Sequence, residues 1–189
     1  MLAAYLAGSF SSAITLSRIM GFPDPRSQGS NNPGATNVLR IAGKKAAALT
    51  LLGDMLKGLI PVLIAHAVFV DSLYIALVGL SAFIGHCYPL YYRFEGGKGV
   101  ATAIGFVVAF DWQMGLAVIA IWLLVARISK LSALAALTAF IALPIIHALW
   151  RDDPMVSITL AAMSIILVYR HKSNIRRLFS GTEEKSRLN

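Results

Sequence analysis

The sequence predicts an all-α integral membrane protein, a bundle of seven transmembrane helices of which some are short. Of its 189 residues, 57% are hydrophobic and only 14% are charged, whereas about 25% of the residues in a soluble domain carry charge. The charges also cluster, and they leave apolar runs that are suited to crossing a membrane. We therefore expect a single polytopic domain over residues 1–189, with spans at about 2–17, 46–70, 72–92, 100–110, 114–126, 131–149 and 155–169.

The first two expected spans carry polar residues that suggest how they pack. No basic segment precedes the first span, so we interpret it as a retained helix and not as a cleaved signal. Asp54 and Lys57 in the second span lie on one face of a helix, where they can pair. Because an unpaired charge is costly in a membrane, we expect a structural ion pair there. Small residues that favour close helix contacts fill the first span: Gly8, Ser9, Ser11, Ser12, Thr15 and Ser17.

Residues 100–126 form either one long helix with Asp111 in its middle or two short helices that turn there. With two helices there are seven spans, and 15 of the 17 Lys and Arg residues lie on one side of the membrane. The exceptions are Lys57, which lies within a span, and Arg151, which lies on the other side. With six spans, the basic tail would move to the side opposite the first two basic loops. The positive-inside rule therefore favours seven spans, with the N-terminus outside and the C-terminus in the cytoplasm.

The formal net charge of +8 would suggest a nucleic-acid partner in a soluble protein. Here the positive-inside rule explains the charge, and no RNA-binding signature is present, so we expect no nucleic acid. With one cysteine, Cys87, the chain has no internal disulfide. No histidine–carboxylate spacing suggests a metal site, and we expect neither a metal nor a cofactor.

The first predicted cytoplasmic loop, residues 28–45, is rich in groups that bind anions. Its glycines permit close approach of the backbone, and Arg40 supplies a forked cation. We expect a helix to begin near Asn32 and Pro33, with Asn32 as its cap and free N–H groups at its start. The alternative interpretation is a well-capped loop at the membrane interface. The candidate binding residues in this loop are Ser30, Asn32, Gly34, Thr36, Asn37 and Arg40.

The second candidate segment is the run Gly96–Gly97–Lys98–Gly99 between the third and fourth spans. It is not a Walker A loop, because the glycine spacing of that motif is missing and Val100 follows Gly99. Successive glycine N–H groups can still form an anion-binding nest, to which the lysine adds a point charge. The alternative is a flexible turn with a snorkelling lysine.

Other polar residues lie at the ends of the spans. His171 and Asn174 follow the last span in a basic segment that is either part of a site or a lipid-contacting end. Ser129 and Ser132 offer hydroxyl donors or helix caps, and His86 could orient the run 96–99. The pattern H-x-x-x-x-D from His147 to Asp152 matches the acid/base motif of the common glycerolipid acyltransferases. We interpret it as chance, because the predicted topology places it on the outer side.

Six segments of the chain carry a combined signal, in the order "GSF" (8–10), "GSNNPGATNVLR" (29–40), "LLGDMLKG" (51–58), "GHCYPLYYRFEGGKGVATA" (85–103), "SKLSAL" (129–134) and "RHKSNIRRLFSGTE" (170–183). Together they resemble the PlsY family, the bacterial integral-membrane glycerol-3-phosphate acyltransferases that use acyl phosphate as donor. The resemblance implies seven spans in the bacterial inner membrane, with the site facing the cytoplasm. It implies acylation of sn-glycerol 3-phosphate to lysophosphatidate in phospholipid synthesis, without coenzyme A or acyl carrier protein, and we infer no obligate protein partner. The family usually has proline where Ser11 stands and serine where Lys130 stands.

This reaction brings two phosphate groups close together, and their repulsion must be offset by cations and N–H donors. We expect the backbones of 29–37 and 96–99 to help hold acyl phosphate. We expect glycerol 3-phosphate to bind Arg40, Lys98, Ser132, His171 and Asn174. The general base is either His171 or the phosphate of the donor. A rival hypothesis, a small transporter for anions or phosphate esters, predicts polar residues at mid-membrane depth and an internal repeat, which the sequence lacks.

Overall fold

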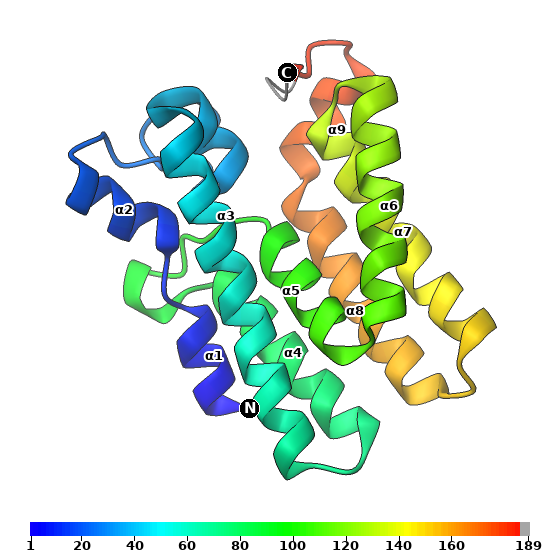
Figure 1. Cartoon of the computed structure of the whole chain (residues 1–189). Helices are drawn as coiled ribbons and strands as arrows, with labels where there is room; N and C mark the ends of the chain where they lie inside the picture. The colour runs from blue at the N-terminus through cyan, green and yellow to red at the C-terminus, as the bar shows by residue number, and fades with distance from the viewer. Residues whose placement is uncertain (186–189) are drawn as a thin grey trace.

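The computed structural model describes residues 1–185, and this part of the chain is built from helices. Figure 1 shows them as two groups, with the short helix α5 between them. The helices are α1 (Leu2–Gly8), α2 (Ser12–Met20), α3 (Ala35–Val68), α4 (Ser72–Cys87), the 3₁₀ turn η1 (Leu90–Tyr92), α5 (Val100–Phe110), α6 (Trp112–Ser129), α7 (Ser132–Trp150), α8 (Pro154–Arg170) and α9 (Lys172–Phe179).

Four helices are long and apolar enough to cross a membrane. They are α3, α4 extended to Tyr92, α6 and α7, and the pair α8 and α9, which bends by 62°, could be a fifth. Large apolar side chains such as Leu149, 78% exposed, and Ile165, 70% exposed, face outward. Exposed surface of this kind suits lipid and would be a liability in water. The chain is a multi-pass membrane protein.

The prediction of one continuous helix over residues 2–17 is wrong, because α1 ends at Gly8 and α2 begins at Ser12. Ser11 caps α2, and its hydroxyl accepts a hydrogen bond from the Ile14 N–H at 3.4 Å. Serine side chains compete with helical hydrogen bonds and favour caps, so this small-residue cluster interrupts the helix even without proline. The break leaves the Phe10 carbonyl free to accept a hydrogen bond from Lys57 Nζ at 2.8 Å.

Helix α3 begins earlier than residue 46, and its start also corrects the predicted cap. The N-cap is Gly34 and not Asn32, and no side chain caps the helix. At Gly43 the backbone has φ 80° and ψ −176°, so the helix is broken there, a conformation that glycine adopts without steric cost. The short first part of α3 therefore carries Thr36, Asn37 and Arg40 on a separate axis from the membrane-spanning part, as Figure 1 shows.

The two-helix interpretation of residues 100–126 is confirmed. Helix α5 ends at Phe110 and α6 begins at Trp112, with Asp111 between them. The Asp111 carboxylate accepts hydrogen bonds from the N–H groups at 113 and 114, at 3.0 and 3.2 Å. Arg151 at the end of α7 donates to the other carboxylate oxygen at 2.7 and 2.9 Å. Helix α6 is longer than the expected 114–126. It begins earlier, at Trp112, because Asp111 caps it there, and it ends later, at Ser129.

Helix α5 joins the two groups of helices and fixes where the run 96–99 lies. It packs against α3, α4 and α6. A Cβ atom at Gly58 would overlap the Thr102 carbonyl, and one at Gly105 would overlap the Met55 carbonyl. The backbones of α3 and α5 are therefore in direct contact, and residues 96–99, which precede α5, are held beside α3.

Candidate functional site

A cavity of about 430 Å³ lies where the loop before α3, the run 96–99, the start of α7 and helix α9 meet. Most of the predicted site residues line it, although they come from four distant segments of the sequence. Gly96, Gly97 and Ser129 do not line it. Those that do are Ser30, Asn32, Gly34, Thr36, Asn37, Arg40, Lys98, Gly99, Ser132, His171 and Asn174.

The same cavity continues into an apolar groove between the helices. Side chains from α3, α5, α6 and α7 form its walls, so one space joins a polar, cationic end to a hydrocarbon-lined part. Such a space fits an amphiphile with an anionic head and an apolar chain. The apolar lining residues include Ala47, Leu51, Met55, Ile104, Ile119, Trp122, Leu123, Ala133 and Ala136.

Asn37 holds the first loop in shape. Its side-chain Oδ1 accepts a hydrogen bond from the Ser30 N–H, and its Nδ2 donates to the carbonyls of Pro25 and Gln28, each at 2.9 Å. The residue is 1% exposed. Both of its N–H donors are therefore used within the protein, and Asn37 positions Ser30 and its neighbours along the cavity.

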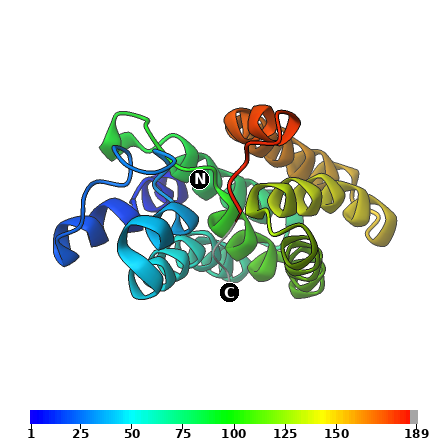
Figure 2. The same ribbon diagram turned by 90° about the horizontal axis from the view of Figure 1, so that it is seen from above.

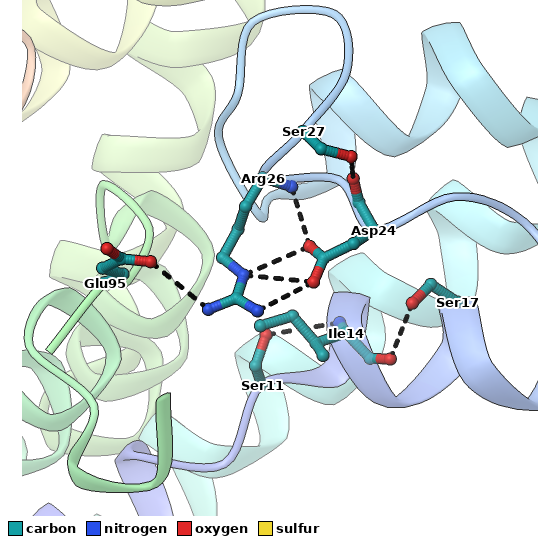
Figure 3. A network of polar contacts seen from close by, with 7 residues as sticks. All are labelled: Ser11, Ile14, Ser17, Asp24, Arg26, Ser27 and Glu95. Atoms are coloured by element: carbon teal, nitrogen blue, oxygen red, sulfur yellow. Dashed lines mark hydrogen bonds and ion pairs between the residues drawn. The ribbon is translucent and has the colours of Figure 1, made fainter. Parts of the chain in front are cut away.

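A second contact joins the segment just before this loop to Glu95, the residue before the run 96–99, as Figure 3 shows. Arg26 binds the Asp24 carboxylate, with its NH2 group 2.8 Å from Oδ2, and its NH1 group lies 3.5 Å from Glu95 Oε2. The hydrogen bond from Arg26 holds the pKa of Asp24 below its ordinary value. Arg26 thus joins the two loops that border the cavity.

The two glycines outside the cavity shape the loop that carries Lys98. The Gly97 N–H donates to the His86 carbonyl at 3.1 Å. Arg170 donates to the Gly97 carbonyl at 3.0 Å and to the Gly96 carbonyl at 2.6 Å. The Gly97 N–H is therefore already engaged, and the groups of this run that line the cavity come from Lys98 and Gly99.

Sequence reasoning missed the role of Arg170. Arg170 follows the last apolar run, where the positive-inside rule is enough to explain a basic residue. Its guanidinium also lies 5.1 Å from the ring centre of Tyr88, as a cation–π contact. Nothing in the sequence signals that its partners are two carbonyls more than seventy residues away.

Lys98 lies two residues before the start of α5 and lines the cavity. Burial lowers the pKa of its amine from 10.5 to about 8, although the Glu183 carboxylate acts in the opposite direction. Gly99 has φ +84° and is the N-cap of α5, so the first N–H groups of that helix begin next to the lysine. Both features favour an anion at this point.

His171 and Asn174 form the opposite wall. The His171 ring is 2% exposed, and its Nδ1 lies 2.8 Å from the Leu167 carbonyl, which makes Nδ1 the protonated nitrogen. Burial lowers the pKa of His171 to about 4, so the imidazole is neutral at pH 7. Asn174 donates from Nδ2 to Glu183 at 2.7 Å, while its buried Oδ1 has no hydrogen-bond partner among residues 1–185.

The tail after α9 runs back across the middle of the bundle, as Figure 2 shows, and its carboxylates contact basic site residues. Glu183 accepts a hydrogen bond from Arg177 at 2.7 Å and lines the cavity. Glu184 lies 3.1 Å from the Arg40 guanidinium. Sequence reasoning gave these acidic residues no role, because nothing local to them shows which cations they reach.

Two further predicted residues lie away from the cavity. Ser129 donates to the Val125 carbonyl at 2.6 Å and accepts from the Leu131 N–H at 3.1 Å, so it closes the turn between α6 and α7. His147 lies in the last turn of α7, at the end remote from Ser132, and its Nδ1 is 2.8 Å from Ser157 Oγ. His147 is absent from the cavity lining, in agreement with its interpretation as a chance match.

In the part of the chain that the structure describes, metal-ligating side chains do not gather at the site. Within residues 1–185, no group of three or more His, Cys, Asp or Glu side chains has the spacing of a metal site. The carboxylates near the cavity, Asp54, Glu183 and Glu184, instead contact cationic or amide groups.

Comparison with known proteins gives a consistent result. A family model described as glycerol-3-phosphate acyltransferase matches residues 1–181. Proteins named glycerol-3-phosphate acyltransferase from Methylococcus capsulatus and Thioalkalivibrio sulfidiphilus are 50% and 51% identical to this chain. The alignments cover 96% and 98% of this chain, and 92% and 91% of those relatives.

Solved structures are similar as well. The crystal structure of PlsY (YgiH), an integral membrane glycerol 3-phosphate acyltransferase, in its glycerol 3-phosphate form has a TM-score of 0.93 and 37% identity. The match covers 97% of this chain and 92% of that chain. The lysophosphatidic acid form has a TM-score of 0.90 and 37% identity, over 96% of this chain and 91% of that one.

Proposed function

This chain belongs to the glycerol-3-phosphate acyltransferase family, and we propose that it uses acyl phosphate as its donor. It is a membrane enzyme that acylates glycerol 3-phosphate in phospholipid synthesis. In the proposed reaction the 1-hydroxyl of sn-glycerol 3-phosphate takes the acyl group, and the products are 1-acylglycerol 3-phosphate and phosphate. Neither a cofactor nor an obligate protein partner takes part.

The observation that carries this proposal is that a cationic end and an apolar groove share one cavity. Glycerol 3-phosphate is small and anionic, so it fits the end formed by Arg40, Lys98 and Ser132. Acyl phosphate needs both parts, with its chain in the groove and its phosphate between the first loop and the start of α5. The orphaned Oδ1 of Asn174 suits a hydroxyl donor, which glycerol 3-phosphate supplies and a fully ionised acyl phosphate does not.

The chemistry requires few groups from the protein. The hydroxyl oxygen attacks the acyl carbonyl carbon, a C–O ester bond forms, and the bond between that carbon and the phosphate oxygen breaks. Phosphate leaves with the electron pair, and the hydroxyl proton passes to a base. Because acyl phosphate is already activated, catalysis rests on positioning and on offsetting the repulsion of two phosphates.

We infer that the departing phosphate itself takes the proton, and that His171 binds and orients. A base with a pKa of about 4 is a weak proton acceptor at neutral pH. Replacing His171 with Ala tests this assignment in single-turnover experiments at saturating glycerol 3-phosphate. We expect weaker binding with a rate within about tenfold of the wild type, whereas loss of a general base costs about 10²- to 10⁴-fold in that rate.

We also propose the finer topology: seven spans, an outside N-terminus, and a cavity that faces the cytoplasm from the bacterial inner membrane. In support, the basic residues Arg40, Lys98 and Arg170 gather at the cavity, while Asp111 pairs with Arg151 at the other end. The short helix α5 and the broken pair α1 and α2 would complete the seven spans in one polytopic domain.

Cysteine labelling tests this orientation, because the native thiol of Cys87 is buried and can be replaced with Ser. In that background, Tyr91→Cys places a thiol at the cavity end and Asp152→Cys places one at the other end. We expect a membrane-impermeant reagent to label Asp152→Cys in intact spheroplasts and Tyr91→Cys only in inverted vesicles. The reverse pattern would contradict the orientation.

The decisive assay compares donors with the purified protein alone. We expect lysophosphatidate and one equivalent of phosphate from acyl phosphate plus glycerol 3-phosphate, and no product from acyl-coenzyme A. Product from acyl-coenzyme A alone would refute the proposed donor. A transporter for phosphate esters would instead move labelled glycerol 3-phosphate into liposomes without forming lysophosphatidate.

A further inference from the structure

Three polar side chains form a buried cluster beside the cavity, which we call the Asp54 cluster: Asp54 and Lys57 of α3, and His86 of α4. Lys57 Nζ lies 3.0 Å from Asp54 Oδ1, which confirms the predicted pair. His86 Nδ1 lies 3.8 Å from the same oxygen. Asp54 is 2% exposed and His86 is 7% exposed, and both line the cavity. Buried charge of this kind in a membrane protein favours a functional role over a purely structural one.

The imidazole of His86 separates α3 from the run 96–99. One ring nitrogen, Nδ1, faces Asp54. The other, Nε2, is the atom that a Cβ on Gly97 would meet first, so the ring packs directly on the Gly97 backbone. The carbonyl of His86 also accepts the Gly97 N–H at 3.1 Å. His86 therefore contacts Gly97 through both its side chain and its backbone.

The cluster is anchored at its far end. Lys57 Nζ donates to the Phe10 carbonyl, which the break between α1 and α2 leaves free. Contacts therefore run from Phe10 through Lys57, Asp54 and His86 to Gly97, the residue before Lys98. On its other side Gly97 is held by Arg170.

We propose that the Asp54 cluster is a positioning site, which holds residues 96–99 so that Lys98 faces the cavity. The proposal rests on the proposed function, because it assigns Lys98 to substrate phosphate. The cluster acts through Gly97, and the two nitrogens of His86 face Asp54 and Gly97. This arrangement supports a role for His86 in positioning Lys98 and not a role in proton transfer to or from the substrate.

Two substitutions of His86, to Ala and to Asn, distinguish positioning from proton transfer. In His86→Asn the amide nitrogen stands near the place of Nδ1 and can donate to Asp54, but an amide accepts no proton at neutral pH. We expect His86→Ala to lower kcat/KM for glycerol 3-phosphate by about 10²-fold, mainly through KM. We expect His86→Asn to lower kcat/KM by only about tenfold relative to the wild type. If both variants lose kcat equally, the positioning role is wrong and the imidazole is a proton acceptor.

Hydrogen–deuterium exchange gives a readout that does not need activity. His86→Ala should speed exchange in the peptide that contains Gly97 and Lys98, whereas peptides of α7 should exchange as in the wild type. Unchanged exchange at Gly97 would overturn the proposal. If His86→Ala does not fold, Asp54→Asn serves the same comparison, because it keeps the shape of the side chain and removes the charge that faces His86.

The wild-type protein separates the two proposals. A wild type that is inactive with acyl phosphate and glycerol 3-phosphate defeats the proposed function, while the exchange experiment still tests whether the cluster holds the loop. An active wild type with normal exchange in His86→Ala defeats only the positioning role.

Discussion

The depressed pKa of Lys98 leads to a prediction about the pH dependence of substrate binding. Burial lowers this pKa from 10.5 to about 8 in the ligand-free chain. The charged amine therefore carries a cost of about 3 kcal/mol at neutral pH. That cost is fully present below pH 8, and it disappears as the pH rises from about 8 towards 10.5 and the folded chain loses its proton. A phosphate dianion beside Lys98 would offset the cost and raise the pKa again.

The magnitude follows from the fraction of protonated lysine. With a pKa of about 8, this fraction falls from about one half at pH 8 to about 3% at pH 9.5, so KM for glycerol 3-phosphate should rise about 16-fold over that range. The substrate does not contribute, because a phosphate monoester with a second pKa near 6 is already a dianion in this range. In Lys98→Arg the guanidinium stays charged, and the rise in KM should vanish.

Initial rates at saturating acyl phosphate, measured from pH 6.5 to 9.5 on wild type and Lys98→Arg, test this reasoning. Short incubations and a blank without enzyme correct for spontaneous hydrolysis of the donor. A flat KM in the wild type would refute the reasoning, and so would an equal rise in Lys98→Arg. A wild-type turnover in Lys98→Met would refute the assignment of Lys98 to the phosphate site altogether.

Three other substitutions test separate parts of the structure. Glu184→Gln should free Arg40 and lower KM for glycerol 3-phosphate by at most about fivefold, because a largely exposed ion pair contributes about 1 kcal/mol or less. Asp152→Asn is the matched control, and a raised KM in Glu184→Gln would contradict the expectation. Lys57→Met should destabilise the protein by about 3 kcal/mol because it leaves Asp54 buried without a countercharge, and adding Asp54→Asn should restore the thermal midpoint in detergent. His147→Ala should leave the rate with acyl phosphate within about twofold of the wild type, since the residue lies outside the cavity, and a larger loss would make the H-x-x-x-x-D match meaningful.

The sequence predicted features that depend on near neighbours and failed where distant segments meet. The turn at Asp111 and the pair of Asp54 with Lys57 follow from local spacing, and the structure confirms both. The hydrogen bond from Arg170 to the Gly96 carbonyl joins segments that are distant in the sequence, and no local pattern predicts it. Residues from the first predicted loop (28–45), from the run 96–99 and from the basic segment after the last span all line the cavity. Sequence alone could not separate these residues from those, such as Gly96, that shape the loop around the cavity.

The broken helices explain why the site lies where it does. A transmembrane helix satisfies its own backbone groups, so a break within or beside a span is tolerated only where protein or a cavity satisfies the freed groups. Here the break after Gly8 frees the Phe10 carbonyl for Lys57, and the start of α5 at Gly99 leaves N–H groups next to Lys98. The bend of 62° between α8 and α9 places Asn174 against the cavity. Each interruption supplies either a support for the proposed anion site or a part of it, which continuous helices of the same composition would not provide.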